Sequence, residues 1–179
     1  MPIEPIQTER LLLRNLIPDD APVMYAIRTH PSTLRFQPWH PADVDAVAAF
    51  IEEQRERSLA LSGWLQLAIV LRESGAFIGD CGLHRQADPA QVEIGITLAP
   101  GERRKGYALE ALRAVLGYLF EKCRVHRVVG VADARNDASI ALMRRAGMRL
   151  EARMRQSYRF RDEWTDEVVF ARLREEWPG

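Results

Sequence analysis

Apolar and polar residues alternate along this chain with two different periods. A period of two residues is typical of strands and predicts strands over 10–16, 64–71, 76–83, 91–98, 128–132, 148–158 and 165–173. Apolar residues three and four apart are typical of helices and predict them up to residue 29, over 43–59, from 107 onward and over 137–146. Antiparallel strands followed by a strand–helix–strand crossover predict an α+β (mixed α/β) fold.

Local signals mark several ends of these elements. Asp19 or Asp20 is expected to cap the helix that runs toward Thr29. The segment Glu73-Ser74-Gly75 predicts a tight turn between two strands. Gly147 is a suitable C-cap for the helix that begins near Asp137.

Bulk composition narrows the class of protein. The chain has 179 residues and is 47% hydrophobic, which is enough for one substantial core, so we expect a single domain over 1–179. Lys plus Arg and Asp plus Glu both number 25, which leaves no overall charge for nucleic-acid binding. No signal-like N-terminus and no run of about 18 apolar residues occurs. We therefore expect a cytoplasmic protein with no membrane and no direct nucleic-acid partner.

The two cysteines form no metal-binding or redox pattern. Cys81 and Cys123 are far apart in the sequence and make no C-x-x-C pair. They fall in a predicted strand and a predicted helix, where buried thiols are usual. No metal site is expected.

The most specific feature is the segment Arg103-Arg104-Lys105-Gly106-Tyr107-Ala108, which lies between a predicted strand and a long amphipathic helix. A glycine lets the backbone approach a ligand closely, and the first N–H groups of a helix have no intrahelical acceptor. The helix dipole and three cationic side chains add positive potential. The segment predicts a site for the pyrophosphate of a larger ligand.

Two familiar phosphate-binding loops do not fit this segment. Tyr107 and Ala108 stand where a P-loop requires Lys and Ser or Thr, and no G-x-G-x-x-G follows a predicted strand. The segment instead resembles the R-x-x-G-x-A form of the signature of the GNAT superfamily of acyl-CoA N-acetyltransferases. Further segments are similar to its RimJ/RimL-like branch. In chain order they are Thr8–Arg14, Asp19–Ala21, Ala76–Leu83, Val92–Ile96, Gly106–Leu112, Asn136–Ser139, Arg145–Met148, Asp166 and Glu176–Trp177.

The resemblance implies a GNAT-like fold, in which the fourth and fifth strands of a mostly antiparallel sheet splay apart and flanking helices cover the sheet. It implies acetyl-CoA as co-substrate, with the pantetheine arm paired to the exposed edge of the fourth strand as an added strand would be. The residues that it assigns to this ligand are Ile96, Thr97, Leu98, Arg103, Arg104, Lys105, Gly106, Tyr107, Ala108 and Asn136.

Transfer to an amine requires a neutral nucleophile. An α-amine with a pKa near 7.7–8.0 costs about 1 kcal/mol to deprotonate at pH 7, whereas a lysine near 10.4 costs about 4.6 kcal/mol. A modest base therefore suffices for an α-amine. The resemblance favours Glu93 as this base, because the family often places a carboxylate on the fourth strand. A pairing of Glu93 with a cation on the sheet surface is the alternative, and His84 is a second candidate for the base.

Departure of the thiol requires less assistance from the protein than deprotonation of a lysine amine, because departure as thiolate costs about 2 kcal/mol at pH 7. Many relatives carry a tyrosine acid where this chain has Met143, which cannot donate a proton. The resemblance implies Ser139 as the substitute. Helix capping is the alternative reading for both Asn136 and Ser139.

The expected acceptor is a primary amine, including a protein N-terminal α-amine. A small-molecule amine such as an antibiotic or polyamine stays open, as does a non-catalytic acyl-CoA sensor and a homodimeric assembly. The resemblance places the acceptor near the first two helices and the late hairpin. In this sequence these are 36–39 and 158–164.

Overall fold

The computed structural model describes residues 3–55, 57–61 and 63–178. In this part of the chain one sheet has the strand order β1-β2-β3-β4-β5-β6-β8-β7. The strands are β1 (Ile6–Gln7), β2 (Leu11–Asn15), β3 (Gly63–Leu71), β4 (Phe77–Arg85), β5 (Gln91–Leu98), β6 (Arg127–Asp133), β7 (Arg149–Phe160) and β8 (Glu163–Leu173). The helices are α1 (Ala21–Thr29), α2 (Pro31–Leu34), α3 (Val44–Arg55), α4 (Tyr107–Gly117) and α5 (Asp137–Arg145).

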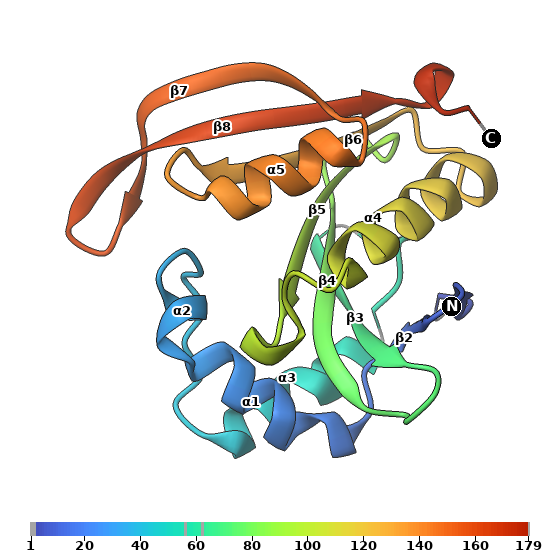
Figure 1. The fold of residues 1–179 in the computed structure, drawn as a ribbon, viewed down its shortest axis with the longest axis vertical. Helices are drawn as coiled ribbons and strands as arrows, with labels where there is room; N and C mark the ends of the chain where they lie inside the picture. Colours follow the sequence, from blue (N-terminus) through green and yellow to red (C-terminus); the bar gives the residue numbers. More distant parts are fainter. Residues whose placement is uncertain (1–2, 56, 62, 179) are drawn as a thin grey trace.

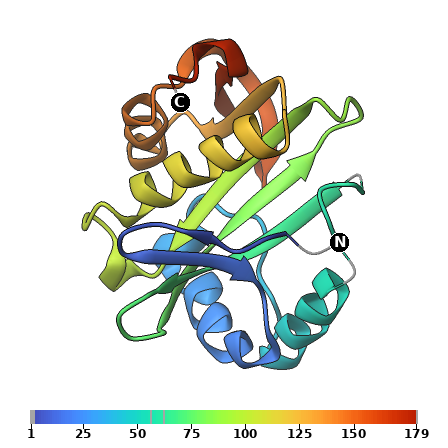
Figure 2. The same cartoon turned by 90° about the vertical axis from the view of Figure 1, so that its right-hand side faces the viewer.

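Helices cover the sheet in two layers. α4 crosses one face of the sheet, and α1 and α3 lie on the opposite face (Figures 1 and 2). α5 lies on the same side as α4, and the long β7–β8 hairpin extends until its turn lies near α2 (Figure 1). Every strand pair in the described sheet is antiparallel except β5 with β6. The predicted mixed fold with a mostly antiparallel sheet is confirmed.

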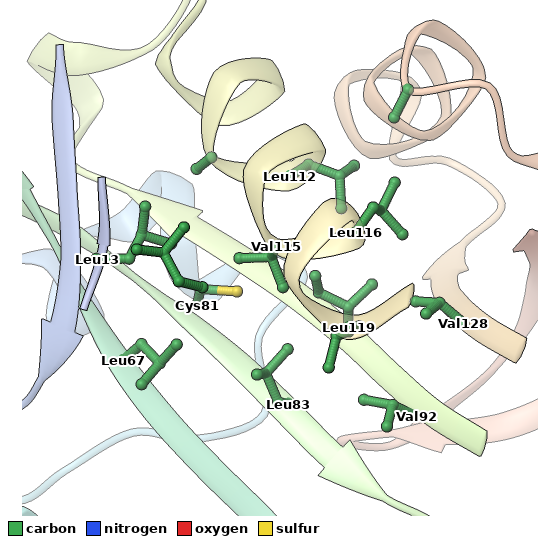
Figure 3. Packing of buried hydrophobic residues seen from close by; sticks show 14 of the residues in the cluster. Leu13, Leu67, Cys81, Leu83, Val92, Leu112, Val115, Leu116, Leu119 and Val128 are labelled. Atoms are coloured by element: carbon green, nitrogen blue, oxygen red, sulfur yellow. The ribbon is translucent and has the colours of Figure 1, made fainter. Parts of the chain in front are cut away.

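The larger core lies between α4 and the sheet. Alternate residues of the central strands, among them Leu67, Leu83 and Val92, point toward Leu112 and Val115 of the helix, and all five are buried (Figure 3). Burying a side chain of this size contributes roughly 1.5–3 kcal/mol. This packing fixes the position of α4, and with it the position of the loop that precedes α4.

A second core lies under α1 and α3 and contains a buried ion pair. Met24, Val47 and Ile51 pack on this face of the sheet. Beside them the Arg28 guanidinium and the Gln66 amide both donate to Asp80 Oδ1. Burial raises the pKa of Asp80, and the charge of Arg28 and the hydrogen bonds oppose that rise. The ion pair ties α1 to the middle of β4.

The sheet opens between β5 and β6. Gln91, Val92 and Glu93 pair in parallel with Arg127, Val128 and Val129, and the register ends there. β6 continues beside β8 as far as Asp133, and β5 continues beside β4 as far as Leu98. These two strands are the fourth and fifth strands of the sequence prediction, so the predicted splay is confirmed.

Several local predictions differ from the structure. Strand β1 and the single-turn helix α2 were not predicted, since each is too short to show a period. The carboxylate of Asp20 makes no helix cap, because it accepts from Arg14 and from the N–H of Ile17 instead. Cys123 is exposed, while Cys81 is buried as expected.

We predict that Asp80→Ala lowers the free energy of unfolding by about 3–5 kcal/mol, because it leaves the buried Arg28 charge without a partner. Denaturant unfolding measures this loss. Glu52→Ala is the matched control, since its pair with Arg55 is exposed, with side-chain exposures of 65% and 60%. That variant should lose no more than about 1 kcal/mol. Equal losses in the two variants would contradict the role assigned to the buried pair.

Candidate functional site

The loop before α4 directs several backbone N–H groups to one place. Arg104 (φ 63°) and Gly106 (φ 89°) both have left-handed backbone conformations. The first intrahelical bond runs from the N–H of Glu110 to the carbonyl of Gly106, so the three preceding N–H groups have no helical acceptor. Left-handed residues in such a loop turn successive N–H groups into a concavity that suits anions.

The three cations of this loop are not equivalent. Arg103 donates to the Leu98 carbonyl (3.2 Å) and to the hydroxyls of Ser32 (2.8 Å) and Thr33 (2.9 Å). Lys105 pairs with Glu102 at 3.0 Å. Arg104 has no recorded side-chain partner within the described part of the chain. Arg103 thus holds α2 against the end of β5, and the assignment of Arg103, Arg104 and Lys105 to a ligand stays a prediction.

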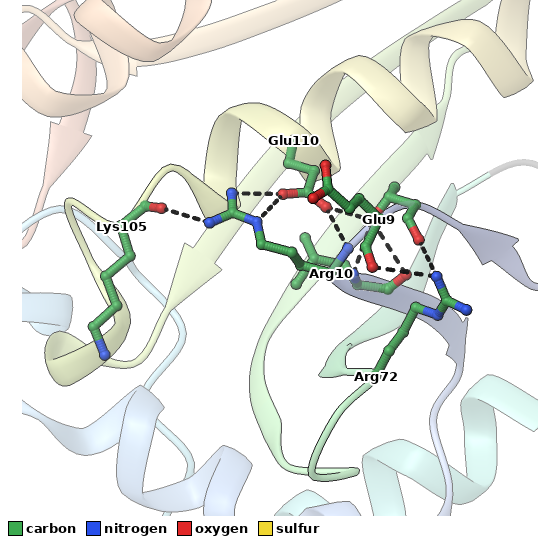
Figure 4. A network of polar contacts seen from close by, with 7 residues as sticks. Glu9, Arg10, Arg72, Lys105 and Glu110 are labelled. Atoms are coloured by element: carbon green, nitrogen blue, oxygen red, sulfur yellow. Dashed lines mark hydrogen bonds and ion pairs between the residues drawn. The ribbon is translucent and has the colours of Figure 1, made fainter.

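A further cation reaches the loop from the N-terminal segment. The Arg10 side chain donates to the Lys105 carbonyl (3.1 Å) and pairs with Glu110 (2.6 Å) (Figure 4). Its guanidinium also lies over the Tyr107 ring. The Glu110 carboxylate also accepts from the hydroxyl of Thr8 (2.6 Å). Burial by itself raises the pKa of Glu110, but these hydrogen bonds hold it below its ordinary value. Arg10 and Glu110 are about a hundred residues apart, so no sequence pattern indicates this pair.

The open edge of β5 exposes unpaired backbone groups. The N–H of Ala99 donates to the Ile78 carbonyl, which makes Leu98 and Gly79 a non-hydrogen-bonded pair of the β4–β5 ladder. By alternation, Leu98, Ile96 and Ile94 direct their N–H and C=O groups away from β4. The Leu98 carbonyl accepts from Arg103, and the parallel pairing of Glu93 with Val129 uses the N–H of Ile94. The groups without a partner strand are therefore the Ile94 carbonyl, both groups of Ile96 and the Leu98 N–H.

A small hollow of about 90 Å³ lies where β5 and β6 separate. Both sides of the opening contribute side chains, and α5 contributes Ser139, Leu142 and Met143. Its lining residues include Gly95, Ile96, Leu112, Asn136, Ser139 and Met143, together with Phe36 and Gln37 from the opposite face of the sheet. The hollow therefore contains three residues that the sequence analysis assigned to acetyl-CoA binding or to catalysis: Ile96, Asn136 and Ser139.

Capping accounts for part of the polar chemistry in this hollow. Asn136 Oδ1 accepts the backbone N–H of Ser139 at 3.2 Å, which is the helix cap considered from the sequence. The Asn136 amide NH₂ and the Ser139 hydroxyl have no recorded partner in the described residues. Met143 packs against Gly130, where an added Cβ would lie 2.5 Å from its sulfur. The methionine fills space beside the hollow.

The two candidate bases are neighbours across the β4–β5 ladder. His84 lies opposite Glu93, and His84 Nδ1 is 3.9 Å from Glu93 Oε2, which is too long for a direct hydrogen bond. The His84 ring stacks on Trp64. Burial raises the pKa of Glu93, while the charge of His84 lowers it and that of Glu167 raises it. Glu93 is therefore coupled to His84 and is not an isolated surface charge.

A larger hollow of about 460 Å³ lies between the end of α2 and the turn of the β7–β8 hairpin. Its lining residues are Arg35, Phe36, Arg135, Phe160, Arg161, Asp162 and Glu163. Phe36 also lines the small hollow, so the two hollows are adjacent. The sequence analysis indicated 36–39 and 158–164 for an acceptor, but it missed Arg35 and Arg135. Trp39 packs against Phe50 instead, and Trp164 is 60% exposed.

Comparison with known proteins shows the family to which this chain belongs. The family described as acetyltransferase (GNAT) domain matches residues 10–149. An uncharacterized N-acetyltransferase of Bacillus subtilis (strain 168), YnaD, is 27% identical over 172 residues, which cover 96% of this chain and 98% of the relative. A crystal structure of an acetyltransferase (GNAT family) from Bacillus anthracis is similar with a TM-score of 0.87 and 25% identity, and the match covers 97% of this chain and 100% of that one.

The chain belongs to the acetyltransferase (GNAT) domain family, and it is an N-acetyltransferase. The family predicted from the sequence is confirmed. RimL, a ribosomal-protein α-N-acetyltransferase determined in complex with coenzyme A, shares the fold with a TM-score of 0.84 at 17% identity, over 97% of this chain and 100% of RimL. None of the helices in the described residues is both long and apolar enough to cross a membrane.

We predict that Glu93 titrates above the ordinary glutamate pKa of about 4.3. His84→Phe keeps a stacking ring but removes the charge, so the pKa of Glu93 should rise further. Glu167→Gln removes a repelling charge and should lower it. Carbon-13 NMR titration of the Glu93 carboxyl measures its pKa in the wild type and in the two variants. Shifts of the same sign in both variants would show that the cluster is not coupled as described.

Proposed function

We propose that this N-acetyltransferase takes the acetyl group from acetyl-CoA and transfers it to a primary amine, with the reaction in the hollow between β5 and β6. The observation that carries the proposal is the position of that hollow. It lies beside the unpaired edge of β5 and is lined by α4, whose amide-rich first turn suits a pyrophosphate, and by the start of α5, which supplies Asn136 and Ser139.

The substrate acetyl-CoA is bound mainly by backbone groups in this proposal. The amides of the segment Arg103–Ala108 hold the pyrophosphate, with the Arg104 side chain added and Arg103 acting by positioning the loop. A helix dipole contributes about 0.3–1 kcal/mol, whereas micromolar affinity requires roughly 8 kcal/mol. Most affinity must therefore come from amide hydrogen bonds and from burial of the pantetheine arm. That arm pairs with β5 along Ile94 to Leu98 and contacts Asn136.

Glu93 is proposed as the base that accepts the proton of the amine. It lies on the same face of β5 as Gly95, two residues away, which corresponds to about 7 Å along a strand. One ordered water between the amine and the carboxylate suits this separation. The neutral amine attacks the thioester carbonyl, an amide bond forms, and the carbon–sulfur bond breaks.

Ser139 is proposed to donate the proton to the departing sulfur. Its hydroxyl has no recorded partner in the described residues, and its backbone N–H is already capped by Asn136. Because thiolate departure costs about 2 kcal/mol at pH 7, such a donor can contribute at most about thirtyfold to the rate. Ser139 is therefore an assisting acid in this scheme.

An α-amine is the favoured acceptor, because its deprotonation at pH 7 costs about 1 kcal/mol. The N-terminus of a protein, as in the RimJ/RimL-like branch, is an acceptor of this kind, and a small-molecule amine such as an antibiotic or polyamine is the alternative acceptor. The larger hollow, next to Phe36, is where we place the rest of the acceptor. A non-catalytic CoA sensor is the contrary hypothesis. Tight CoA binding without thiol release from acetyl-CoA, across peptide, polyamine and aminoglycoside acceptors, would favour the sensor.

We predict that Gly106→Val weakens CoA binding by about tenfold or more, since a side chain at this left-handed residue strains the loop and obstructs approach to its amides. An added Cβ would also lie 3.2 Å from the Arg10 guanidinium. Calorimetry measures the affinity, and circular dichroism verifies folding. Gly101→Val is the matched control, because nothing lies within 4 Å of its added Cβ and its φ is not left-handed. Undiminished affinity in folded Gly106→Val would disprove the assignment of the pyrophosphate site.

We also predict that Glu93→Gln lowers acetyl transfer by about a hundredfold or more near pH 7 while CoA affinity is retained. The loss should shrink at alkaline pH, where the amine is already neutral. Thiol release under single-turnover conditions measures the rate. Glu52→Gln is the control, because it makes the same change at an exposed carboxylate of α3 that has no proposed role in proton transfer. A wild-type rate in Glu93→Gln at neutral pH would remove Glu93 from the mechanism.

A further inference from the structure

The larger hollow brings together two guanidinium groups from distant parts of the chain. Arg35 follows the last residue of α2, and Arg161 lies in the turn between β7 and β8. The Arg161 side chain donates to the Leu34 carbonyl at 3.3 Å, which joins the hairpin turn to α2. Neither guanidinium has a recorded ion pair with a carboxylate in the described residues.

The third arginine of the hollow, Arg135, already forms ion pairs with two carboxylates. Arg135 binds both carboxylate oxygens of Asp133 (3.0 and 2.8 Å) and one of Glu163 (3.1 Å). Arg35 also lies close enough to Asp133 to act on its charge, but both oxygens of Asp133 are taken by Arg135. Asp162 is the one lining carboxylate without a recorded partner in the described chain. With Asp133 included, the three arginines face three carboxylates, so the hollow has no excess charge. The groups that remain available to a ligand are the guanidinium groups of Arg35 and Arg161 and the carboxylate of Asp162.

Two aromatic rings accompany the available arginines. The Arg35 guanidinium lies 5.0 Å from the centroid of the Phe36 ring, and the Arg161 guanidinium lies 5.2 Å from that of Phe160. Stacking on a ring leaves the edge of a guanidinium, with its N–H donors, available to a planar anion. The rings themselves suit an apolar portion of a ligand next to that anion.

The position of the hollow connects this chemistry to the reaction. Phe36 lines both hollows, and Arg135 of the larger one precedes Asn136 of the smaller one. A molecule with its amine at the small hollow therefore extends toward Arg35 and Arg161. A volume of about 460 Å³ falls within the range of roughly 300–1,000 Å³ that is usual for small-molecule sites.

We infer that the acceptor carries a carboxylate, which Arg35 and Arg161 bind while the amine is acetylated. This inference specifies the acceptor class and rests on the proposed function. A short peptide or amino-acid derivative with an apolar side chain beside its carboxylate has the required chemistry. A polycationic acceptor would instead have to rely on Asp162 against two unpaired arginines.

The first experiment measures binding without turnover. In the presence of CoA, N-acetyl-alanyl-phenylalanine and its C-terminal carboxamide are titrated into the protein by calorimetry. The two ligands differ in charge and hardly in shape. The carboxylate form should bind about tenfold to a hundredfold more tightly, as charge-assisted hydrogen bonds to guanidinium groups predict.

Variants test whether Arg35 and Arg161 cause the preference for the carboxylate ligand. In Arg35→Gln combined with Arg161→Gln, the ratio of the two affinities should fall to about one, while the affinity for the carboxamide stays near that of the wild type. Arg159→Gln removes an exposed charge from the same hairpin without touching the hollow, so it should keep the wild-type ratio. Equal affinities in the wild type, or a ratio that survives in the double variant, would overturn the inference.

The second experiment separates this inference from the proposed function. Alanyl-phenylalanine, its carboxamide and spermidine are compared as acceptors of acetyl-CoA by thiol release. The carboxylate dipeptide should have a kcat/KM about tenfold or more above the carboxamide, and the double variant should remove that advantage. Preference for spermidine, with a loss in Asp162→Asn, would overturn the inference while leaving amine acetylation intact. Selective binding of the carboxylate ligand without any turnover would support carboxylate binding by Arg35 and Arg161 and refute the proposed reaction.

Discussion

The separation of β5 from β6 is the constraint on which the rest of the site depends. Three residue pairs hold the two strands together, and beyond Glu93 and Val129 each strand follows a different neighbour. The Ile94 carbonyl and both backbone groups of Ile96 are left without a strand partner. Unpaired backbone groups at a sheet edge favour an added strand or a ligand that imitates one. The same separation produces the hollow that Asn136 and Ser139 line from the start of α5.

Because the opening passes through the sheet, the small hollow has walls from both faces. Leu112, Leu142 and Met143 belong to the helices on one side, and Phe36 and Gln37 come from the loop after α2 on the other. A hollow with walls from both faces can bring two reacting groups together at one point, which is what a group transfer requires. The two candidate bases also belong to one side of the sheet, since Glu93 and His84 lie on the face opposite α4.

Long-range polar contacts hold the parts around this opening. The Arg10–Glu110 pair fixes the loop before α4, and Arg103 connects the end of β5 to Ser32 and Thr33. The buried Arg28 pairs with Asp80, and its other terminal nitrogen lies 3.4 Å from Gln37 Oε1. Most of these contacts join residues at least fifty positions apart. Arg10, Arg28 and Arg103 thus position the elements around the site through contacts within the protein. They are therefore less available to bind a ligand than an arginine without such partners.

Periodicity alone determined most of the strands and helices of this protein, because apolar faces must be buried whatever their partners are. The loop of residues 103–108 could be predicted for a related reason, since a glycine at a helix start acts through local backbone geometry. Only the tertiary structure decided which cations of that loop are already occupied. It also decided that Glu93 lies beside His84 and that Arg35 lies near Arg161. Such neighbours depend on strand register and on the docking of a hairpin, and these are set by packing across the whole chain and leave no period in the sequence.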